Sequence, residues 1–281
     1  MKVHSIKHYF LALAVVLAVS APPANSGAAA QTATAPHAAG PAQTETKVSS
    51  AARIEPLRPG FELPNGQTLH YEADWRFVTA GMASFHVERT GSQEHLEGSA
   101  DSTGVVAMLF RVADRSNSYF DAKTLCSSKV IKHTEEGSHR RETVITYDYS
   151  RGKAVLEERN FKTNEQKRTE NDIPGCVTDV VSGILYVASL PLQQGASYSF
   201  PLNDGSKTVT VQAHVEGKEQ VKTPAGTFNT IRVGPEGEYG PLKNRGRVWI
   251  WYTDDAQHLP VQMRAKLSWG TLTVLLTSVS K

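Results

Sequence analysis

The sequence predicts a mainly β domain: a large curved antiparallel sheet, or a barrel or half-barrel, with one helix packed against it. Between residues 67 and 281 most segments alternate apolar and polar residues with a period of two, the pattern of strands with one buried face. A single segment near residues 177–190 repeats its apolar residues at helical spacing. Roughly ten strands against one clear helix favour an antiparallel sheet over a parallel α/β fold.

The first part of the chain has the layout of a secretory signal peptide. Lys2 and Lys7 precede an apolar run from Tyr9 to Val19, and small residues ending in Ala28-Ala29-Ala30 follow. The apolar run is about half the ~20 residues that a membrane-spanning helix needs. We therefore expect residues 1–30 to be removed and the mature protein to have no transmembrane segment. The domain would then reach the periplasm or the extracellular space.

A low-complexity segment follows the signal. From Ala21 to Ser50 the chain consists largely of Ala, Pro, Thr, Gln and Ser, with almost no large apolar residue. Such a composition buries too little surface to offset the entropy of ordering the chain. We expect residues 31–60 to form a disordered tether and residues 67–281 to form a single β domain.

The domain opens with a pair of strands. The first strand alternates polar residues with apolar and aromatic ones, namely Leu69, Tyr71, Ala73, Trp75 and Phe77. Ala80-Gly81 interrupts this run, and a second alternating run covers residues 83–87. Together these segments predict an antiparallel hairpin. A third short strand fits residues 96–101.

The middle of the domain predicts a meander followed by the helix. Charged strands fit residues 130–133, 140–149 and 153–160, with glycine-containing turns between them. The helix is indicated by apolar residues at three- and four-residue steps: Val177, Val180, Val181, Ile184, Leu185 and Ala188. Thr178 or Asp179 stands where an N-cap is expected. A shorter helical turn fits residues 105–110.

The last third of the domain returns to strands. Asn203-Asp204-Gly205 is typical of a hairpin turn, and a proline and a glycine mark another turn at residues 223–228. Alternating runs then fit strands at residues 246–252, 261–267 and 271–279. The strand pattern therefore continues to the end of the chain.

Cys126 and Cys176 are the two cysteines of the chain. In an exported protein an even number of cysteines indicates a disulfide, whereas the alternative is two separate buried thiols. Two isolated cysteines without a nearby histidine pair make a poor set of zinc ligands. The sequence therefore predicts a Cys126–Cys176 disulfide and no metal centre.

The charge balance gives no reason to expect a nucleic-acid partner. The chain has 30 Lys and Arg against 28 Asp and Glu, and removal of Lys2 and Lys7 leaves 28 against 28. A neutral protein has no general electrostatic attraction to nucleic acid. The sequence contains no phosphate-binding loop, dinucleotide fingerprint or nucleophile elbow, and it indicates no cofactor.

One histidine pair allows a metal-binding hypothesis with a simpler alternative. His133 and His139 would approach each other across a proposed hairpin, where Glu135 or Glu136 could complete a ligand set. Solvated turn residues fit the same pattern. The pair Asp254-Asp255 fits a turn better than an acid–base pair, because adjacent strand residues point to opposite faces.

Aromatic residues are the stronger candidates for a binding surface. Trp249 and Trp251 share one face of their strand, while Trp75 and Tyr71 belong to the first strand. One interpretation is an apolar pocket between the sheet and the helix, with these four residues in its wall. The other interpretation is ordinary core packing under the helix.

Several motifs, in their order along the chain, resemble an exported bacterial family known as domain of unknown function family 3108. The matching stretches are Tyr71-x-x-x-Trp75 leading to Ala80-Gly81, Val112–Ser116, Asp179–Gly183, Thr223–Phe228, Trp249-x-x-x-x-Asp254-Asp255 and Leu259-Pro260-Val261. The similarity spans almost the whole domain. It implies an exported, mostly β fold with no established activity, and it supplies no catalytic residues.

Three classes of function fit these observations. A non-catalytic carrier in the periplasm or cell envelope, binding an apolar or amphipathic ligand such as a lipid or a glycan, fits the curved sheet and the tryptophans. A structural module that docks on an envelope protein fits the same facts. A hydrolase of envelope material fits less well, because no catalytic site can be assembled from the sequence.

The signal peptide gives the first testable prediction. Protein recovered from the cell envelope should begin near Gln31, or near Gly27, because small-residue sites precede both positions. N-terminal sequencing and intact mass would locate the new N-terminus. An intact Met1 on envelope-purified protein would contradict this processing.

Overall fold

The computed structural model describes residues 52–76, 78–235, 247–267 and 270–281, which form one antiparallel sheet of 14 strands and two short helices. The predicted signal peptide and most of the predicted tether lie outside the described residues. The elements are β1 Gln67–Trp75, β2 Val78–Thr90, β3 Gln93–Ser102, α1 Gly104–Leu109, β4 Ala113–Asp121, β5 Ser127–Glu136, β6 His139–Asp148, β7 Lys153–Asn160, β8 Gln166–Asp172, α2 Val180–Ser189, β9 Ser197–Asn203, β10 Thr208–Thr223, β11 Gly226–Pro235, β12 Arg247–Thr253, β13 Pro260–Leu267 and β14 Gly270–Ser280.

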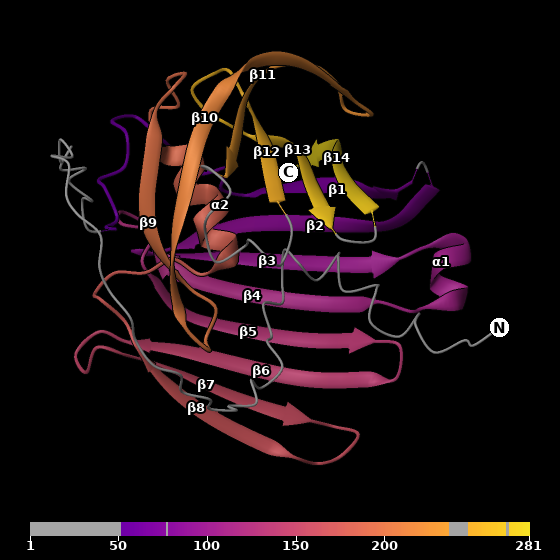
Figure 1. Ribbon diagram of the computed structural model, residues 1–281, viewed down its shortest axis with the longest axis vertical. Helices are drawn as coiled ribbons and strands as arrows, with labels where there is room; N and C mark the ends of the chain where they lie inside the picture. The colour runs from indigo at the N-terminus through magenta and orange to yellow at the C-terminus, as the bar shows by residue number, and fades with distance from the viewer. Residues whose placement is uncertain (1–51, 77, 236–246, 268–269) are drawn as a thin grey trace, which may run out of the picture.

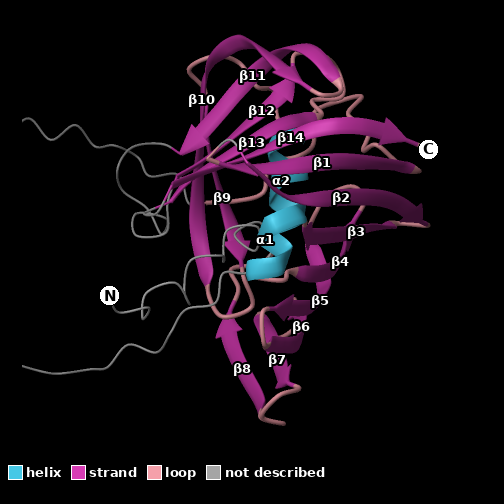
Figure 2. Cartoon of the chain, turned by 90° about the vertical axis from the view of Figure 1, so that its right-hand side faces the viewer, coloured by secondary structure: helices cyan, strands magenta, loops and turns pink. Residues whose placement is uncertain are grey.

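The sheet consists of two meanders joined through the first and last strands. Its order is β8-β7-β6-β5-β4-β3-β2-β1-β14-β13-β12-β11-β10-β9. We call β1–β8 the first leaf and β9–β14 the second leaf. Curvature of the sheet turns the leaves toward each other, with α2 between them (Figures 1 and 2). The predicted large, curved antiparallel sheet is confirmed, and it is an open sheet because β8 and β9 are edge strands.

Among the described residues, side-chain hydrogen bonds and no strand ladder connect edge strand β8 to the β9–β10 hairpin. The amide of Asn171, at the end of β8, donates to the Gly205 carbonyl over 2.8 Å. The hydroxyl of Thr208 donates to the Asp172 carbonyl over 2.9 Å. A Cβ atom at Gly205 would lie 2.7 Å from Ile145, so the β9–β10 turn can pack against β6 only with a glycine at this position.

The main core surrounds α2, whose residues are buried on nearly every side. Leu185, Tyr186 and Val187 of the helix pack against both leaves, including Phe120 of β4 and Phe200 of β9. A helix that is apolar all round is typical of a buried position. The predicted helix over residues 177–190 is therefore the central element of the domain. Helix α1 is short and occupies the region where a helical turn was predicted.

Asp179 fixes the beginning of α2. Its carboxylate accepts hydrogen bonds from the backbone N–H groups of Val181 and Ser182, over 2.8 and 3.2 Å. It also accepts hydrogen bonds from the hydroxyl groups of Ser118 in β4, over 2.6 Å, and Ser127 in β5, over 2.7 Å. The N-cap is thus the aspartate of the two predicted candidates, and it ties the helix to the first leaf.

The predicted Cys126–Cys176 disulfide is present. The Cα atoms of the two cysteines are 5.2 Å apart, within the usual range for a disulfide. The neighbouring residues continue the connection, because the Ser127 N–H donates to the Val177 carbonyl over 2.9 Å. The disulfide therefore holds the chain segment that enters α2 against the start of β5.

The end of the predicted tether differs from the expectation. Residues 52–66, which we call the strap, contact the domain, although residues up to 60 were expected to be disordered. Ile54 and Leu57 pack against the main core, and the Glu55 N–H donates to the Tyr186 hydroxyl over 2.7 Å. Ile54 and Leu57 follow a long segment that is poor in large apolar residues. The average composition of that segment therefore did not reveal them.

The disulfide gives a second prediction. Replacing both Cys126 and Cys176 by Ser should lower the free energy of unfolding by about 4 kcal/mol, because a loop of roughly fifty residues is no longer closed in the unfolded chain. Urea denaturation would measure the difference. Dithiothreitol should destabilise the parent by a similar amount and leave the double variant unchanged. Equal stability of parent and variant without reductant would contradict the prediction.

Candidate functional site

An apolar cavity lies between α2 and the concave face of the sheet. Its free volume is about 30 Å³, enough for about two water molecules. The wall is apolar apart from a polar rim made by Gln257 and His258. The lining residues are Phe61, Pro64, Leu69, Tyr71, Phe85, Val87, Leu96, Val181, Ile184, Leu185, Ala188, Gln257, His258, Leu259, Pro260 and Met263.

Tyr71 is the member of this wall that the sequence predicted. It is fully buried, and its ring meets Phe85 edge-on with 5.7 Å between ring centres. Its hydroxyl donates to the Pro260 carbonyl over 2.8 Å, and burial raises the pKa of Tyr71 well above its usual value. The phenol is therefore neutral and its donor is satisfied, so Tyr71 presents an apolar surface to the cavity.

The strap closes one side of the cavity. Phe61 and Pro64 of the strap are part of the lining. Arg58 fastens the strap: its backbone N–H donates to the Ser189 carbonyl over 3.1 Å, and its guanidinium donates to the Ala256 carbonyl over 2.7 Å. These bonds join the strap to the last residue of α2 and to the turn between β12 and β13.

His258 connects this turn to α2 at the cavity rim. Its Nδ1 lies 2.7 Å from the Ala188 carbonyl, which can only accept, so Nδ1 carries the proton. Nε2 is then an acceptor, and an Arg58 nitrogen lies 3.4 Å away. Burial lowers the pKa of His258. The imidazole is therefore neutral at pH 7 and acts as a bridge between α2 and the strap.

Trp249 and Trp251 lie on the opposite face of the sheet from this cavity. Ile250 and Tyr252 of the same strand face α2, since the Tyr252 hydroxyl donates to the Ile184 carbonyl over 2.9 Å. Alternate residues of a strand point to opposite faces, which directs the two tryptophans away from the helix. The expected position of Trp249 and Trp251 in the wall between sheet and helix is therefore wrong.

The two tryptophans instead attach the β10–β11 hairpin to the outer face. The Trp249 indole N–H donates to Glu216 over 2.9 Å, and the Trp251 indole N–H donates to Glu219 over 2.7 Å. Arg232 forms ion pairs with both carboxylates. The tip of the hairpin reaches β14, where the Ala225 N–H donates to the Leu276 carbonyl over 3.1 Å. This arrangement satisfies every indole donor of the pair and leaves a packed outer core.

Trp75 lies at the end of β1, away from the cavity lining. It pairs with Leu272 of β14, and the Arg76 guanidinium is 5.1 Å from its ring centre. Of the four aromatic residues predicted to bind a ligand, only Tyr71 lines the cavity. Three further lining residues, Phe61, Ile184 and His258, were not predicted from the sequence, because Phe61 lies before the first predicted strand, Ile184 was assigned to the helix and no pattern distinguished His258 from the other histidines.

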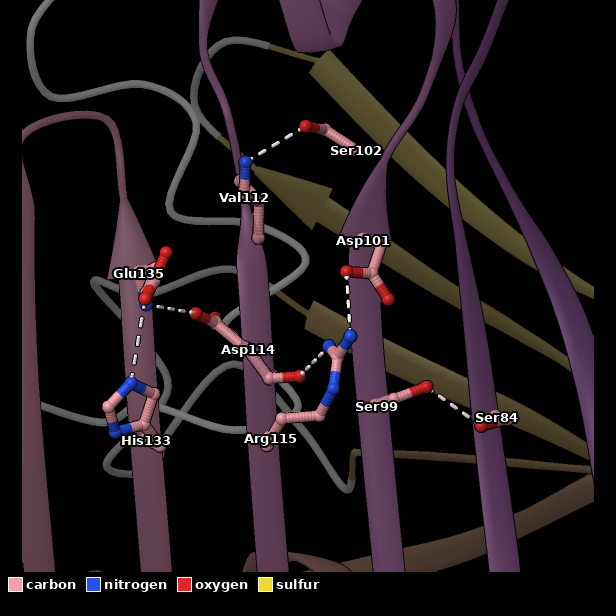
Figure 3. A network of polar contacts seen from close by, with 9 residues as sticks. All are labelled: Ser84, Ser99, Asp101, Ser102, Val112, Asp114, Arg115, His133 and Glu135. Atoms are coloured by element: carbon pink, nitrogen blue, oxygen red, sulfur yellow. Dashed lines mark hydrogen bonds and ion pairs between the residues drawn. The ribbon is translucent and has the colours of Figure 1, made fainter.

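His133 and Glu135 belong to a polar network on the convex face of the first leaf (Figure 3). His133 Nε2 lies 3.6 Å from the Glu135 carboxylate, and Arg115 donates to Asp101 over 3.0 Å. Within the described ranges no group of three His, Cys, Asp or Glu side chains is placed to hold a metal ion. The network is a set of cross-strand ion pairs of a kind that contributes little to stability.

Among the described residues, a buried polar group on the concave face is the arrangement that most resembles a catalytic site. Ser116 stands directly opposite Lys132 in the β4–β5 register, and burial lowers the pKa of Lys132. Burial and the nearby Glu136 raise the pKa of Asp114 to about 7. The space beside Lys132 measures about 10 Å³, room for one water molecule. A substrate has no room there, so this group does not favour the hydrolase hypothesis.

The tryptophan attachment gives a third prediction. A Cβ atom at Gly234 would lie 2.4 Å from Glu216 and 2.6 Å from the Trp249 ring. Gly234→Ala should therefore displace the indole, lower the free energy of unfolding by about 1–3 kcal/mol and shift tryptophan emission toward the red. Gly217→Ala is the matched control, because its nearest neighbour is 3.5 Å away. Identical emission and stability for the two variants would contradict this role of Gly234.

Comparison with solved structures supports the fold. A β-barrel-like protein of the domain of unknown function DUF1849 from Brucella abortus aligns with a TM-score of 0.53 and 9% identity, over 82% of this chain and 99% of that chain. A protein from Parabacteroides distasonis described as a "putative lipoprotein" aligns with a TM-score of 0.31 and 11% identity, over 78% of this chain and 97% of its own. A protein with a YmcC-like fold from Bacteroides fragilis aligns with a TM-score of 0.30 and 11% identity, over 79% and 98%. The first similarity shows a shared fold and nothing about activity.

Sequence comparisons identify the family. No curated protein is significantly similar to the chain. In the described part of the chain, neither helix is long and apolar enough to cross a membrane. Residues 70–277 match the family model described as "protein of unknown function (DUF3108)", which covers nearly all of the sheet. The chain therefore belongs to the DUF3108 family.

Proposed function

We propose that this domain is a non-catalytic carrier, acting outside the cytoplasm, that binds the acyl chain of a lipid in the cavity beside α2. The observation that carries the proposal is a cavity with apolar walls whose polar groups are confined to one rim. Gln257 and His258 are the polar residues of the lining. An amphipathic ligand matches this arrangement, with its chain among the apolar residues and its head group at the rim.

The nature of the wall favours a lipid over a glycan. A sugar ring needs hydrogen-bonding partners for its hydroxyl groups, and burying them without partners is costly. Tyr71 offers none, because its hydroxyl is bonded to a backbone carbonyl. An acyl chain needs only apolar contact, which contributes about 25 cal/mol for each Å² removed from water before the costs of binding are subtracted.

The ligand would enter by displacing the strap. A free volume of about 30 Å³ is far below the roughly 300 Å³ of a small-molecule site. Phe61 occupies the side of the cavity that the strap closes, and it belongs to a segment without helix or strand. Lifting the strap would open the cavity to the surface, and an acyl chain would replace the apolar contacts of Phe61.

The Arg58 side chain would then have a different binding partner in each of two states of the carrier, closed and open. In the closed state its guanidinium bonds to the Ala256 carbonyl. In the open state it would be released beside the rim, where a cation suits the carboxylate or phosphate of a lipid head group. The two roles are mutually exclusive, so head-group binding and strap closure would compete for one side chain.

Binding of dansyl-labelled undecanoic acid tests the proposal. Ile184→Trp should weaken binding at least about tenfold, because the larger side chain fills the cavity. Arg58→Ala should accelerate uptake, since the strap loses its bond to the β12–β13 turn. Arg53→Ala is the matched control: this arginine belongs to the same strap, and its ion-pair partner among the described residues is Glu55 at the surface.

The decisive measurements are fluorescence titration and stopped-flow mixing. Circular dichroism must show that each variant remains folded. Absence of binding by the parent chain would overturn the carrier proposal and favour an interaction module. So would a folded Ile184→Trp variant that binds as tightly as the parent. Equal uptake rates for Arg58→Ala and Arg53→Ala would refute entry through the strap.

A further inference from the structure

The imidazole of His258 lies where three parts of the domain meet at the rim of the cavity. His258 belongs to the turn between β12 and β13 and is 4% exposed. Its Nδ1 donates to the Ala188 carbonyl in α2, and its Nε2 lies 3.4 Å from a guanidinium nitrogen of Arg58 in the strap. The turn, the helix and the strap are therefore joined through one ring that can take up a proton.

The backbone of the turn fixes the position of this ring. His258 has a φ of 47°, in the left-handed region that histidine adopts more readily than most residues. The Asp255 carboxylate accepts hydrogen bonds from the N–H groups of Gln257 and His258, over 2.9 and 3.1 Å. These bonds hold the backbone in the conformation from which the ring reaches both α2 and the strap.

The contact between His258 and Arg58 depends on an unprotonated Nε2. In the neutral ring Nε2 accepts, whereas a guanidinium has only donors. Protonation would place a second donor and a second positive charge opposite Arg58, while the Nδ1 bond to the Ala188 carbonyl would remain. Another nitrogen of the same guanidinium donates to the Ala256 carbonyl over 2.7 Å. Repulsion at His258 therefore acts on the group that fastens the strap.

The charged groups around the ring do not cancel this repulsion. Asp254 and Asp255 of the turn are nearby carboxylates, but Asp254 pairs with Lys218 over 2.6 Å and Asp255 bonds to N–H groups of its own turn. The ten residues of α2 include no charged side chain. Burial, the largest effect, and Arg58 lower the pKa of His258, and the helix carbonyl and the two aspartates offset them only in part.

We propose that His258 is an acid-sensitive latch: uptake of a proton breaks its contact with Arg58 and releases the strap from the cavity. This inference rests on the proposed function, in which the strap lifts before a lipid enters. An open strap exposes the imidazole to water, where its pKa returns toward about 6.5. The open state then binds a proton that the closed state excludes, so acidification below about pH 6.5 favours opening.

The open, protonated rim is suited to an anionic head group. Arg58 and His258 would then be two neighbouring cations at the polar end of an apolar cavity. A carboxylate or phosphate between them would supply the acceptors that both have lost. Proton uptake and the binding of an acidic lipid would therefore strengthen each other.

A distance measurement on the full chain tests the latch without any ligand. Glu62 in the strap and Lys222 in β10 are exposed, and Glu62→Cys with Lys222→Cys would accept nitroxide spin labels. Double electron–electron resonance should show one main distance at pH 7.5 and a second, broader population at pH 5. The open fraction should rise at least about threefold, because each pH unit below about 6.5 favours the open state by up to about tenfold.

His258→Asn separates the latch from other effects of acid. Asparagine tolerates left-handed backbone, and its amide can donate to the Ala188 carbonyl, but it takes up no proton. The labelled variant should keep one distance at both pH values. It also controls for Asp114, whose pKa is about 7. His95→Asn is the matched control, because His95 bonds to Asn117 over 2.8 Å on the convex face and should leave the acid response unchanged.

Equal distance distributions of the parent at pH 7.5 and pH 5 would overturn the latch. So would an equal acid response in the parent and His258→Asn, or loss of the β signal in circular dichroism together with the release, since release would then be global unfolding. Dansyl-labelled undecanoic acid supplies the ligand arm, and its uptake should be faster at pH 6 than at pH 7.5 in the parent alone. A strap that opens in acid but admits no ligand would overturn the carrier and support the latch. Ligand binding with an acid-insensitive strap would do the reverse.

Discussion

Helix α2 is enclosed by the two leaves, and water cannot satisfy the backbone groups that remain unpaired at its ends. Asp179 accepts the N–H groups of the first turn and anchors them to hydroxyls of β4 and β5. Carbonyls of the last two turns accept hydrogen bonds from the hydroxyl of Tyr252, the imidazole of His258 and the backbone N–H of Arg58. Strands β4, β5 and β12, the β12–β13 turn and the strap are therefore each attached to the helix through these bonds.

Because of this constraint the strap acts as a cap for α2: the Arg58 N–H pairs with the carbonyl of Ser189, the last residue of the helix. If the strap is displaced as proposed, the Ser189 carbonyl loses the Arg58 N–H, and a ligand or water must replace this donor. The second leaf does not depend on the helix alone, because Trp249 and Trp251 attach its longest hairpin to the outer face. The domain thus has an outer core fastened by the indole bonds and an inner core that a short, irregular segment covers.

Much of the fold could be predicted from the sequence, because local patterns determine it. The alternation around Tyr71 and the helical spacing before Leu185 each point to one structure, and the even cysteine count indicates the disulfide. The residues of the cavity wall were harder to predict, because both faces of the strand containing Trp249 are apolar. An alternation with a period of two does not determine which of these faces meets the helix. That choice depends on the register with Met263 in the neighbouring strand, which no local pattern encodes. The strap was missed because two apolar residues contribute little to an average composition.

The pairing of β1 with β14 joins the two ends of the domain, with Thr68 opposite Ser280. All other neighbours in the sheet are consecutive strands, so each leaf can form from local hairpins. The two leaves join only when β14 pairs with β1. Contacts between such distant residues form slowly, because a long loop must close first. A ribosome or a translocation channel that still holds β14 therefore keeps the two leaves apart. Loss of the final strand would leave β1 and β13 as exposed edges in the middle of the sheet, where another chain could pair with them.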